Sequence, residues 1–375
     1  MRILVAIDSF KGSLSSLEAG NAVKSGIKSF CDEVIVKPVA DGGEGTVEAL
    51  ADALGGKYID VITQNPLGVK ILARYAMVGE LAIMEMASAS GLTLLEKNER
   101  NLLKTSTYGF GLMIKDAIKK GARKFIIGIG GSATNDAGTG MLSALGFVFY
   151  DKSGNFLEGN GANLSKIAKI STLNTIKELK ECEFLVACDV DNPLFGKNGA
   201  AYVYGPQKGA DEAMVKELDS GLVSFASVVD KEIVAQTWKL RGSGAAGGLG
   251  YGFVSFLNAK LKPGVQIITE EISLEDEIRM ADLVITGEGR MDFQSSMGKT
   301  PTGVAKLAKK YDKPVIALAG SVSKCANECN KNGIDAFFSI QNEPISLDEA
   351  MKKSVASENL KRVSEQAVRL FLLRR

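Results

Sequence analysis

The fold is decided where the chain begins, at Ile3-Leu4-Val5-Ala6-Ile7-Asp8, an apolar run that predicts a buried β-strand ending in an acid. The next segment, Ser15-Ser16-Leu17-Glu18, has the capping-box pattern that opens a helix. A second apolar run over 34–39 leads into a glycine turn and another helix. Strands that are apolar at almost every position and alternate with helices are typical of a parallel sheet covered on both faces. The beginning of the chain therefore predicts an α/β fold.

The middle of the chain has a different pattern. Three extended runs, over 58–63, 70–78 and 81–86, are joined by short turns, which favours antiparallel hairpins. The alternation of strands and helices returns at Leu283 and continues to the end. We expect a discontinuous Rossmann-like parallel-sheet domain of residues 1–60 plus 283–375. A second, mixed α/β domain of residues 61–282 is inserted into it, with the active-site cleft between the two.

Composition excludes several classes of protein. The chain has 375 residues, more than a single core usually holds, and 45 Lys+Arg balance 44 Asp+Glu. A net charge of +1 gives no general attraction to nucleic acid or to an anionic membrane. No apolar run has the length of a signal sequence or a membrane span, so we expect a cytoplasmic protein. The oligomeric state cannot be read from this composition.

The chain contains no histidine. This absence excludes Ser-His-Asp and Cys-His catalysis, histidine metal sites and a histidine general base. Acid–base chemistry must therefore fall to Asp, Glu, Lys, Tyr or Cys. The five cysteines match no zinc or redox spacing, and we expect them to be reduced.

The strongest indication of function in the sequence is a set of four glycine clusters. Most of them follow an apolar run, and several carry acids. They cover residues 40–46, 128–136, 242–248 and 286–292. Glycine at a turn between strand and helix lets backbone N–H groups approach an anion, and the start of the helix adds partial positive charge. Acids beside such turns would repel a phosphate unless a hard cation such as Mg²⁺ lies between them. A single cluster of this kind is usually an ordinary tight turn. Four of them together predict that the protein binds ATP and Mg²⁺.

The second cluster also permits another reading. Gly128-x-Gly130-x-x-Ala133 follows a predicted strand, and Asp151 has the spacing of the ribose-binding acid in a dinucleotide fold. An NAD(P)-dependent oxidoreductase is therefore the alternative function. Asn135-Asp136, expected at the start of the following helix, argues against it, because a pyrophosphate needs unopposed positive potential there. A third possibility is a nucleotide-binding regulatory module without chemistry.

Two further segments carry candidate site residues. Asp189 and Asp191 follow a buried strand two residues apart and point to one side if extended, which suits a metal or a base-plus-metal pair. A turn made with the following Asn192-Pro193 is an equal alternative. Lys11 follows the first strand, where open α/β sheets bind ligands, and suits an anionic substrate or a phosphate.

Taken together, these segments resemble the type-1 glycerate kinase family over essentially the whole chain and in the same order. The matching stretches are 8–15, 40–46, 86–92, 127–136, 189–194, 204–210, 244–250 and 285–292. The sequence departs from the family pattern at Leu112, where the family often has an acid, and at 137–140. The resemblance implies a two-domain kinase that transfers a phosphoryl group from ATP to a hydroxyl of D-glycerate.

On the basis of this resemblance, we expect the candidate residues to have the following roles in a kinase. Gly130, Gly131, Ser132, Thr134 and Asn135 hold nucleotide phosphates. Lys11 and Arg290 neutralise the glycerate carboxylate or the charge that develops during transfer. Mg²⁺ is held by Asp191 and Asp292, with Asp189 an alternative ligand. The base that orients the substrate hydroxyl is Asp189, Asp41 or Asp292.

Overall fold

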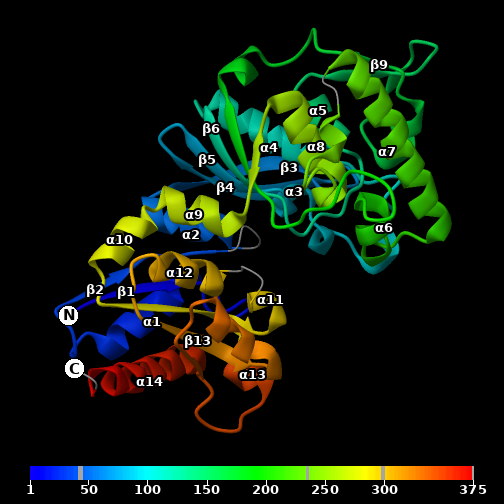
Figure 1. Cartoon of the computed structure of the whole chain (residues 1–375). Helices are drawn as coiled ribbons and strands as arrows, with labels where there is room; N and C mark the ends of the chain where they lie inside the picture. The colour runs from blue at the N-terminus through cyan, green and yellow to red at the C-terminus, as the bar shows by residue number, and fades with distance from the viewer. Residues whose placement is uncertain (41–44, 234–235, 297–299, 374–375) are drawn as a thin grey trace. The chain divides into compact units, whose positions relative to one another are not determined.

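The computed structural model describes residues 1–40, 45–233, 236–296 and 300–373. The chain divides into two compact units. Unit 1 consists of Met1–Asp41, Glu48–Gly56 and Val265–Arg375, and unit 2 of Gly42–Val47 and Lys57–Gly264. Each unit is built on its own sheet, and parallel strands occur in both, so the molecule is a mixed α/β protein (Figure 1).

Unit 1 has a five-stranded sheet whose neighbouring strands are all parallel, in the order β14-β13-β12-β1-β2. The strands are β1 (Arg2–Ile7), β2 (Glu33–Val36), β12 (Leu283–Met291), β13 (Val315–Val322) and β14 (Ala336–Ser339). The helices are α1 (Ser16–Ile27), α9 (Gly264–Glu271), α10 (Leu274–Met280), α11 (Phe293–Ser296), α12 (Thr300–Lys309), α13 (Leu347–Ala350) and α14 (Lys353–Leu372). Helix α2 (Thr46–Leu54) begins in the segment assigned to unit 2, and from Glu48 onward it belongs to unit 1. Helices α1 and α14 cover one face of the sheet, and α10 and α12 cover the other (Figure 1).

The first helix begins where the sequence predicts. The Ser15 hydroxyl accepts the Glu18 N–H at 3.2 Å, and the Glu18 carboxylate accepts the Ser15 N–H at 2.9 Å. This capping box satisfies two donors that the first turn of a helix leaves unpaired. Buried Val23 and Ile27 then pack toward Ile3 and Val5 of β1, which fixes the helix on the sheet.

Unit 2 has a six-stranded sheet in the order β11-β10-β6-β5-β4-β3. Its strands are β3 (Lys57–Gln64), β4 (Lys70–Val78), β5 (Leu81–Glu85), β6 (Lys124–Gly128), β10 (Glu183–Ala187) and β11 (Lys260–Lys262). The pairs β3–β4 and β4–β5 are antiparallel, which confirms the predicted hairpins, while β5, β6, β10 and β11 are parallel. A separate small sheet contains β7 (Val148–Tyr150), β8 (Phe156–Leu157) and β9 (Lys169–Ser171).

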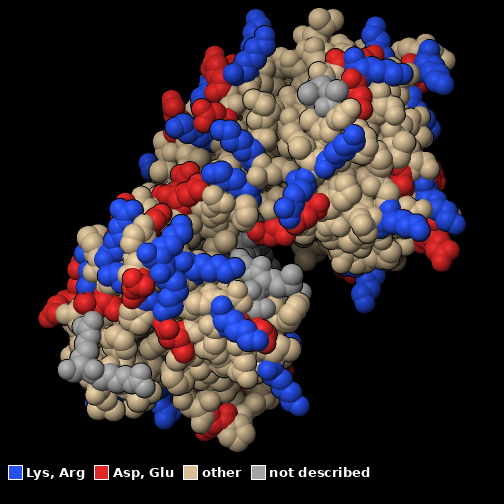
Figure 2. Space-filling view, viewed as in Figure 1, with Lys and Arg blue, Asp and Glu red and all other residues tan. Residues whose placement is uncertain are grey.

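The helices of unit 2 enclose an apolar core rich in aromatic side chains, among them Phe110, Phe225 and Phe253. These helices are α3 (Ala87–Ser90), α4 (Tyr108–Lys119), α5 (Thr139–Ala144), α6 (Ala200–Tyr204), α7 (Glu212–Glu232) and α8 (Ala245–Leu257). Among the described helices, none combines the length and the apolar character needed to cross a bilayer. Lysine and arginine are interspersed with aspartate and glutamate over the face shown in Figure 2.

The glycine cluster at 286–292 is not a turn between strand and helix, so this expectation is wrong. Strand β12 continues through it, and its pairing with β13 extends to Met291 opposite Val322. Gly287 serves close packing instead, because a Cβ at this position would lie 2.0 Å from the carbonyl oxygen of Leu318. Arg290 is therefore presented by a strand, not by the start of a helix.

Candidate functional site

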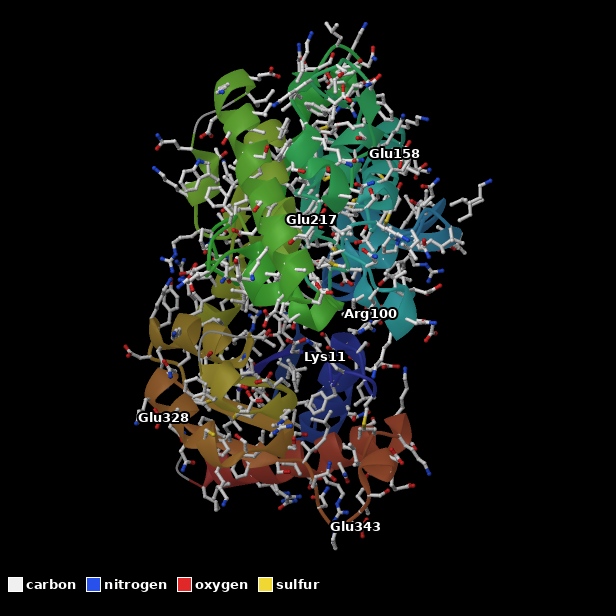
Figure 3. All side chains as sticks on the ribbon, turned by 90° about the vertical axis from the view of Figure 1, so that its right-hand side faces the viewer. Lys11, Arg100, Glu158, Glu217, Glu328 and Glu343 are labelled. Atoms are coloured by element: carbon white, nitrogen blue, oxygen red, sulfur yellow. The ribbon has the colours of Figure 1, made fainter. Side chains whose placement is uncertain are left out.

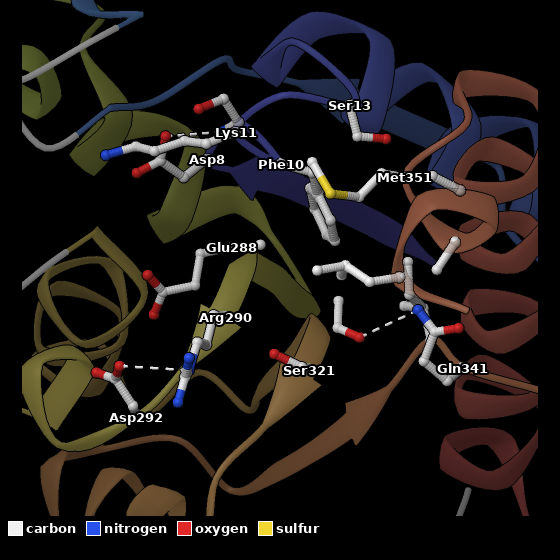
Figure 4. Close-up of a pocket in the computed structure, with 17 residues that line it drawn as sticks. Asp8, Phe10, Lys11, Ser13, Glu288, Arg290, Asp292, Ser321, Gln341 and Met351 are labelled. Carbon is white, nitrogen blue, oxygen red and sulfur yellow. Dashed lines mark hydrogen bonds and ion pairs between the residues drawn. The ribbon is translucent and has the colours of Figure 1, made fainter. Parts of the chain in front are cut away.

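The carboxyl ends of β1, β12, β13 and β14 border a pocket of about 430 Å³ (Figure 4). Lys11, Arg290 and Asp292, three of the residues singled out in the sequence, line it together with Asp8 and Glu288. Open α/β sheets bind their ligands at this edge. The described residues that line the pocket belong to unit 1, and its charged side chains come from the segments at the ends of β1 and β12.

A tight loop presents Lys11 at this edge (Figure 3). After β1, the Phe10 and Leu14 backbones exchange hydrogen bonds of 2.8 and 3.1 Å, which closes a short hairpin over residues 10–14. Gly12 has φ +77°, a conformation that costs a residue with a side chain about 1–2 kcal/mol. The hairpin thus holds an exposed lysine over a buried strand end.

The charged side of the pocket contains both signs. The Arg290 Nε lies 3.7 Å from an Asp292 oxygen, and the Arg290 side chain is 71% exposed. Asp8 is buried and accepts a hydrogen bond of 2.7 Å from the Thr300 hydroxyl. Among the described residues that line the pocket, Glu288 is a third acid beside Asp8 and Asp292, and Lys11 and Arg290 are the two bases.

The opposite side of the pocket is largely apolar. Phe10 and Met351 lie there, and Gln341 adds an amide that donates to the Gly320 carbonyl at 3.2 Å (Figure 4). A pocket with a charged side and an apolar side is the usual form of a small-molecule site.

In unit 2, the predicted phosphate-binding residues form the turn that follows β6. The turn is tied to the segment after β5, because Leu92 N–H donates to Gly131 at 2.8 Å and Ala133 N–H donates to Ser90 at 2.9 Å. Gly131 has φ +71°, and Gly130 and Gly131 are exposed. The following Ser132, Thr134 and Asn135 are buried.

Polar atoms of this turn lack partners. Among the described residues, the Thr134 Oγ1 and the Asn135 Nδ2 are buried and make no hydrogen bond, and the same is true of the nearby Ser90 Oγ. Burying a polar atom without a partner costs about 1–3 kcal/mol. Such atoms suit a site whose ligand supplies the missing bonds, and a phosphate offers acceptor oxygens for the hydroxyl and amide donors.

The third glycine cluster packs directly against this turn. Ala137 N–H donates to the Gly247 carbonyl at 3.0 Å, and a Cβ on Gly247 would lie 2.0 Å from the Thr134 carbonyl oxygen. Gly244 N–H donates to Asn192 at 2.9 Å, which ties the same cluster to the segment after β10. Segments far apart in the sequence therefore meet at one place in unit 2.

Gly247→Ala should disrupt this meeting point. The new Cβ would clash with backbone, and φ +68° adds a conformational penalty, so we expect a loss of about 3 kcal/mol in the free energy of unfolding. Gly79→Ala is the matched control, because Gly79 has φ +58° but no atom within 4 Å of the added Cβ. Chemical denaturation compares the two. Equal losses would show that the close approach to Thr134 contributes nothing.

Asp189 and Asp191 are both exposed after β10, and each already has a partner. An oxygen of Asp189 accepts the Gly264 N–H at 3.0 Å. The Arg241 guanidinium binds Asp191 through two hydrogen bonds, one of 2.9 Å from Nε, and holds the pKa of this carboxyl below its usual range. Mg²⁺ at Asp191 would have to compete with this guanidinium.

The dinucleotide interpretation does not agree with the structure. Asp151 lies in the hairpin turn between β7 and β8, where its carboxylate accepts the N–H groups of Ser153 and Asn155, both at 2.8 Å. It therefore follows an antiparallel strand of the small sheet, not the next parallel strand after β6. Asp136 is fully buried and accepts N–H groups of Gly138 and Gly140 at the start of α5, so it holds the turn together.

The structure thus groups the candidate residues into two sets. Lys11, Arg290 and Asp292 share the unit 1 pocket, and Gly130, Gly131, Ser132, Thr134 and Asn135 share the unit 2 turn. Asp41 lies outside the described residues. Within the described part of the chain, no three acids, cysteines or histidines are placed to hold a metal ion together.

Sequence reasoning gave no role to Asp8 and Glu288 of the pocket, although both lie in stretches that carry the family resemblance, and it gave none to Lys208, which contacts the unit 2 turn. Lys208 Nζ donates to the Ser132 hydroxyl at 2.6 Å and to the Thr134 carbonyl at 2.9 Å. The two chain segments lie 76 residues apart, so no local pattern links them. Its only signal was its place in the 204–210 stretch that carries part of the family resemblance.

The comparisons with known proteins agree with this geometry. The model of the glycerate kinase family matches residues 3–372. A glycerate kinase of Bacillus subtilis (strain 168) is 46% identical over 97% of this chain and 96% of its own length, and a glycerate 2-kinase of Escherichia coli (strain K12) is 45% identical with the same coverage. The solved structure of a glycerate kinase 2 from Salmonella typhimurium LT2 has a TM-score of 0.91 at 42% identity, covering 100% of this chain and 98% of that one. These matches do not support an oxidoreductase, and the chain belongs to the glycerate kinase family.

Proposed function

We propose that the chain is a glycerate kinase that transfers the γ-phosphoryl group of ATP to a hydroxyl of D-glycerate, giving phosphoglycerate and ADP. The observation that carries this function is the family match over residues 3–372. The chain is thus a kinase with an alcohol group as acceptor. Phosphoryl transfer needs positioning and charge neutralisation more than covalent help from the protein, which suits a chain without histidine.

The acceptor is the 2-hydroxyl in our proposal, supported by the relative named as a glycerate 2-kinase at 45% identity. The product of ATP and D-glycerate should then be 2-phosphoglycerate. A proton-coupled phosphorus NMR spectrum checks this, because a phosphate on the 2-oxygen couples to one proton and gives a doublet. A triplet from the two protons of the 3-carbon would reject the proposed position while leaving the kinase activity intact.

The nucleotide phosphates bind at the unit 2 turn in this proposal. The exposed backbone of Gly130 and Gly131 permits close approach of an anion, and Ser132 contributes a hydroxyl. The buried atoms of Thr134 and Asn135 that lack partners fit a group rich in acceptor oxygens.

The unit 1 pocket supplies positive charge for glycerate or for the transferred group. Lys11 and Arg290 lie on its charged side, and a guanidinium can bind a carboxylate through two parallel hydrogen bonds. Both side chains are exposed, so they can reach a ligand without unfolding their surroundings. We assign them to the glycerate carboxylate or to the charge that develops on the phosphoryl group.

Mg²⁺ fits this pocket because, among the described residues that line it, three are acids and two are bases. Asp292 is the best-supported ligand, since it lines the pocket and is only partly buried. Asp191 is the less favoured ligand because Arg241 already occupies it. Mg²⁺ commonly takes one or two carboxylates together with substrate phosphates, so a cluster of three acids is not required. When bound, the ion neutralises phosphate charge.

Asp189 is our first candidate for the base that orients the substrate hydroxyl. It is exposed at the end of β10, and its bond to Gly264 N–H fixes one carboxylate oxygen. Asp292 and Asp41 are the alternatives in the same role.

We also propose that unit 1 is a discontinuous Rossmann-like domain and unit 2 the inserted domain. The five parallel strands of unit 1, drawn from both ends of the chain, support this. A cytoplasmic location is proposed as well. All five cysteines are free thiols, as in proteins of reducing compartments.

A further inference from the structure

Lys208 is a buried lysine in a protein whose other charges lie mostly at the surface. It is only 5% exposed, at the end of a short 3₁₀ turn, Pro206–Lys208. Lysines are rarely buried without a partner of opposite charge, because removal from water destabilises the charged form. The two atoms that accept from its Nζ, the Ser132 Oγ and the Thr134 carbonyl oxygen, are neutral. A functional reason for the burial is therefore worth seeking.

The surrounding backbone holds Lys208 in place. Ala210 N–H and Lys208 N–H both donate to the Gly205 carbonyl at 3.0 Å, and Gly209 adopts φ +94°. A Cβ on Gly209 would lie 3.1 Å from Arg100, so the turn is packed closely against that segment. These backbone hydrogen bonds and this packing fix the segment from which Lys208 reaches Ser132 and Thr134.

The bond to Ser132 has a chemical consequence. A hydroxyl has one hydrogen to donate, and an ammonium can only donate to it. The Ser132 oxygen accepts from Lys208, so its own hydrogen is left for another acceptor. The ammonium also polarises that hydroxyl and makes it a stronger donor.

We propose that Ser132 and Lys208 form a phosphate-binding pair. The Ser132 hydroxyl donates to a phosphate oxygen, and Lys208 is the buried cation that positions and polarises this hydroxyl. This inference rests on the proposed function, because the phosphate belongs to the nucleotide. Lys208 acts through Ser132 and is a positioning residue. Thr134 Oγ1 and Asn135 Nδ2, buried and without partners among the described residues, supply further donors on the same turn.

The charge of Lys208 then depends on the ligand. Burial lowers its pKa to about 7, and the buried Asp136 carboxyl opposes this shift. Two further charged residues lie beside this segment: Arg100, which a Cβ on Gly209 would meet at 3.1 Å, and Asp211, whose side chain accepts the Met214 N–H at the start of α7. Around pH 8 the empty site therefore holds a mostly neutral amine. A bound phosphate favours the ammonium, raises the pKa of Lys208 and draws a proton from solution.

Proton uptake can be measured directly. ADP with Mg²⁺ is titrated into the protein by calorimetry at pH 8 in two buffers that differ in ionisation enthalpy. We expect the wild type to take up a measurable fraction of a proton and Lys208→Met to take up none. Lys208→Arg, which stays charged, should bind ADP without uptake. Lys216→Met, an exposed lysine on α7, is the matched control and should behave as the wild type.

Kinetics provide a second readout. The kcat/KM for ATP should fall as pH rises above about 7 in the wild type, because the free enzyme loses the Lys208 proton, and this fall should be absent in Lys208→Arg. Ser132→Ala should weaken ADP binding about tenfold and reduce proton uptake.

Equal proton uptake by the wild type and Lys208→Met would overturn the inference, and so would unchanged ADP binding by Ser132→Ala. If Lys208→Met does not fold, Lys208→Arg and Ser132→Ala still decide the matter. Proton-linked ADP binding without D-glycerate-dependent ADP release would reject the proposed function while supporting the site. Glycerate kinase activity without proton uptake on ADP binding would support the proposed function and reject the Ser132–Lys208 pair.

Discussion

Arg290→Gln is expected to lower kcat/KM for D-glycerate by about 10²–10³-fold, the usual cost of removing one group that stabilises developing charge. Arg290 lines the pocket from β12 and is 71% exposed. Its contact with Asp292, at 3.7 Å and open to solvent, is worth little to stability. The substitution should therefore leave the melting temperature within a few degrees of the wild type. Steady-state kinetics with D-glycerate varied at saturating ATP measure the effect.

Arg369→Gln is the control for this experiment. Arg369 also forms an exposed ion pair, with Glu365 one turn away on α14, but it lies outside the pocket. Its kcat/KM should stay within about twofold of the wild type, because Arg369 does not line the pocket. Stability should change little as well, because exposed ion pairs contribute about 0–1 kcal/mol. Equal activity of the two variants would show that Arg290 has no role in binding or turnover of D-glycerate.

Asp189→Asn is expected to lower kcat by about a hundredfold or more, because the substitution removes a general base or a metal ligand. The amide oxygen of asparagine can still accept the Gly264 N–H that Asp189 accepts at 3.0 Å. The local backbone should therefore be preserved, and a loss of activity would report chemistry. Single-turnover measurements at saturating ATP and D-glycerate separate this step from product release.

Asp60→Asn is the matched control for the second substitution. Asp60 is an exposed acid of unit 2 that pairs with Arg74 at 2.7 Å, on the antiparallel part of the sheet. It should turn over at the wild-type rate. Turnover of Asp189→Asn close to the wild type would leave Asp292 and Asp41 as the candidates for the base.

Much of the fold follows from local patterns. The capping box at Ser15 begins α1 as predicted, because its hydrogen bonds are made within four residues. The hairpins of β3, β4 and β5 follow from short turns between extended runs. The length of β12 could not be predicted, because residues 287–291 are rich in glycine and become a strand only by pairing with β13. Tertiary pairing here outweighs local propensity.

The candidate site was predictable to the same degree. Glycine-rich segments identify the turn at 130–135 because the backbone itself requires glycine there. The contacts of Lys208 and Asp8 could not be predicted this way. Each is defined by contacts to residues distant in sequence, the first to Ser132 and the second to Thr300. Such contacts are decided by packing and leave no periodic signal in the chain.

The central claim is that these residues serve phosphoryl transfer to glycerate. Release of ADP by the purified chain, with ATP and Mg²⁺ and with or without D-glycerate, tests it most directly. The account predicts that ADP appears at a rate that depends on D-glycerate and saturates with it. ATP binding with no glycerate-dependent ADP would contradict the account and identify the chain as a nucleotide-binding protein without this chemistry.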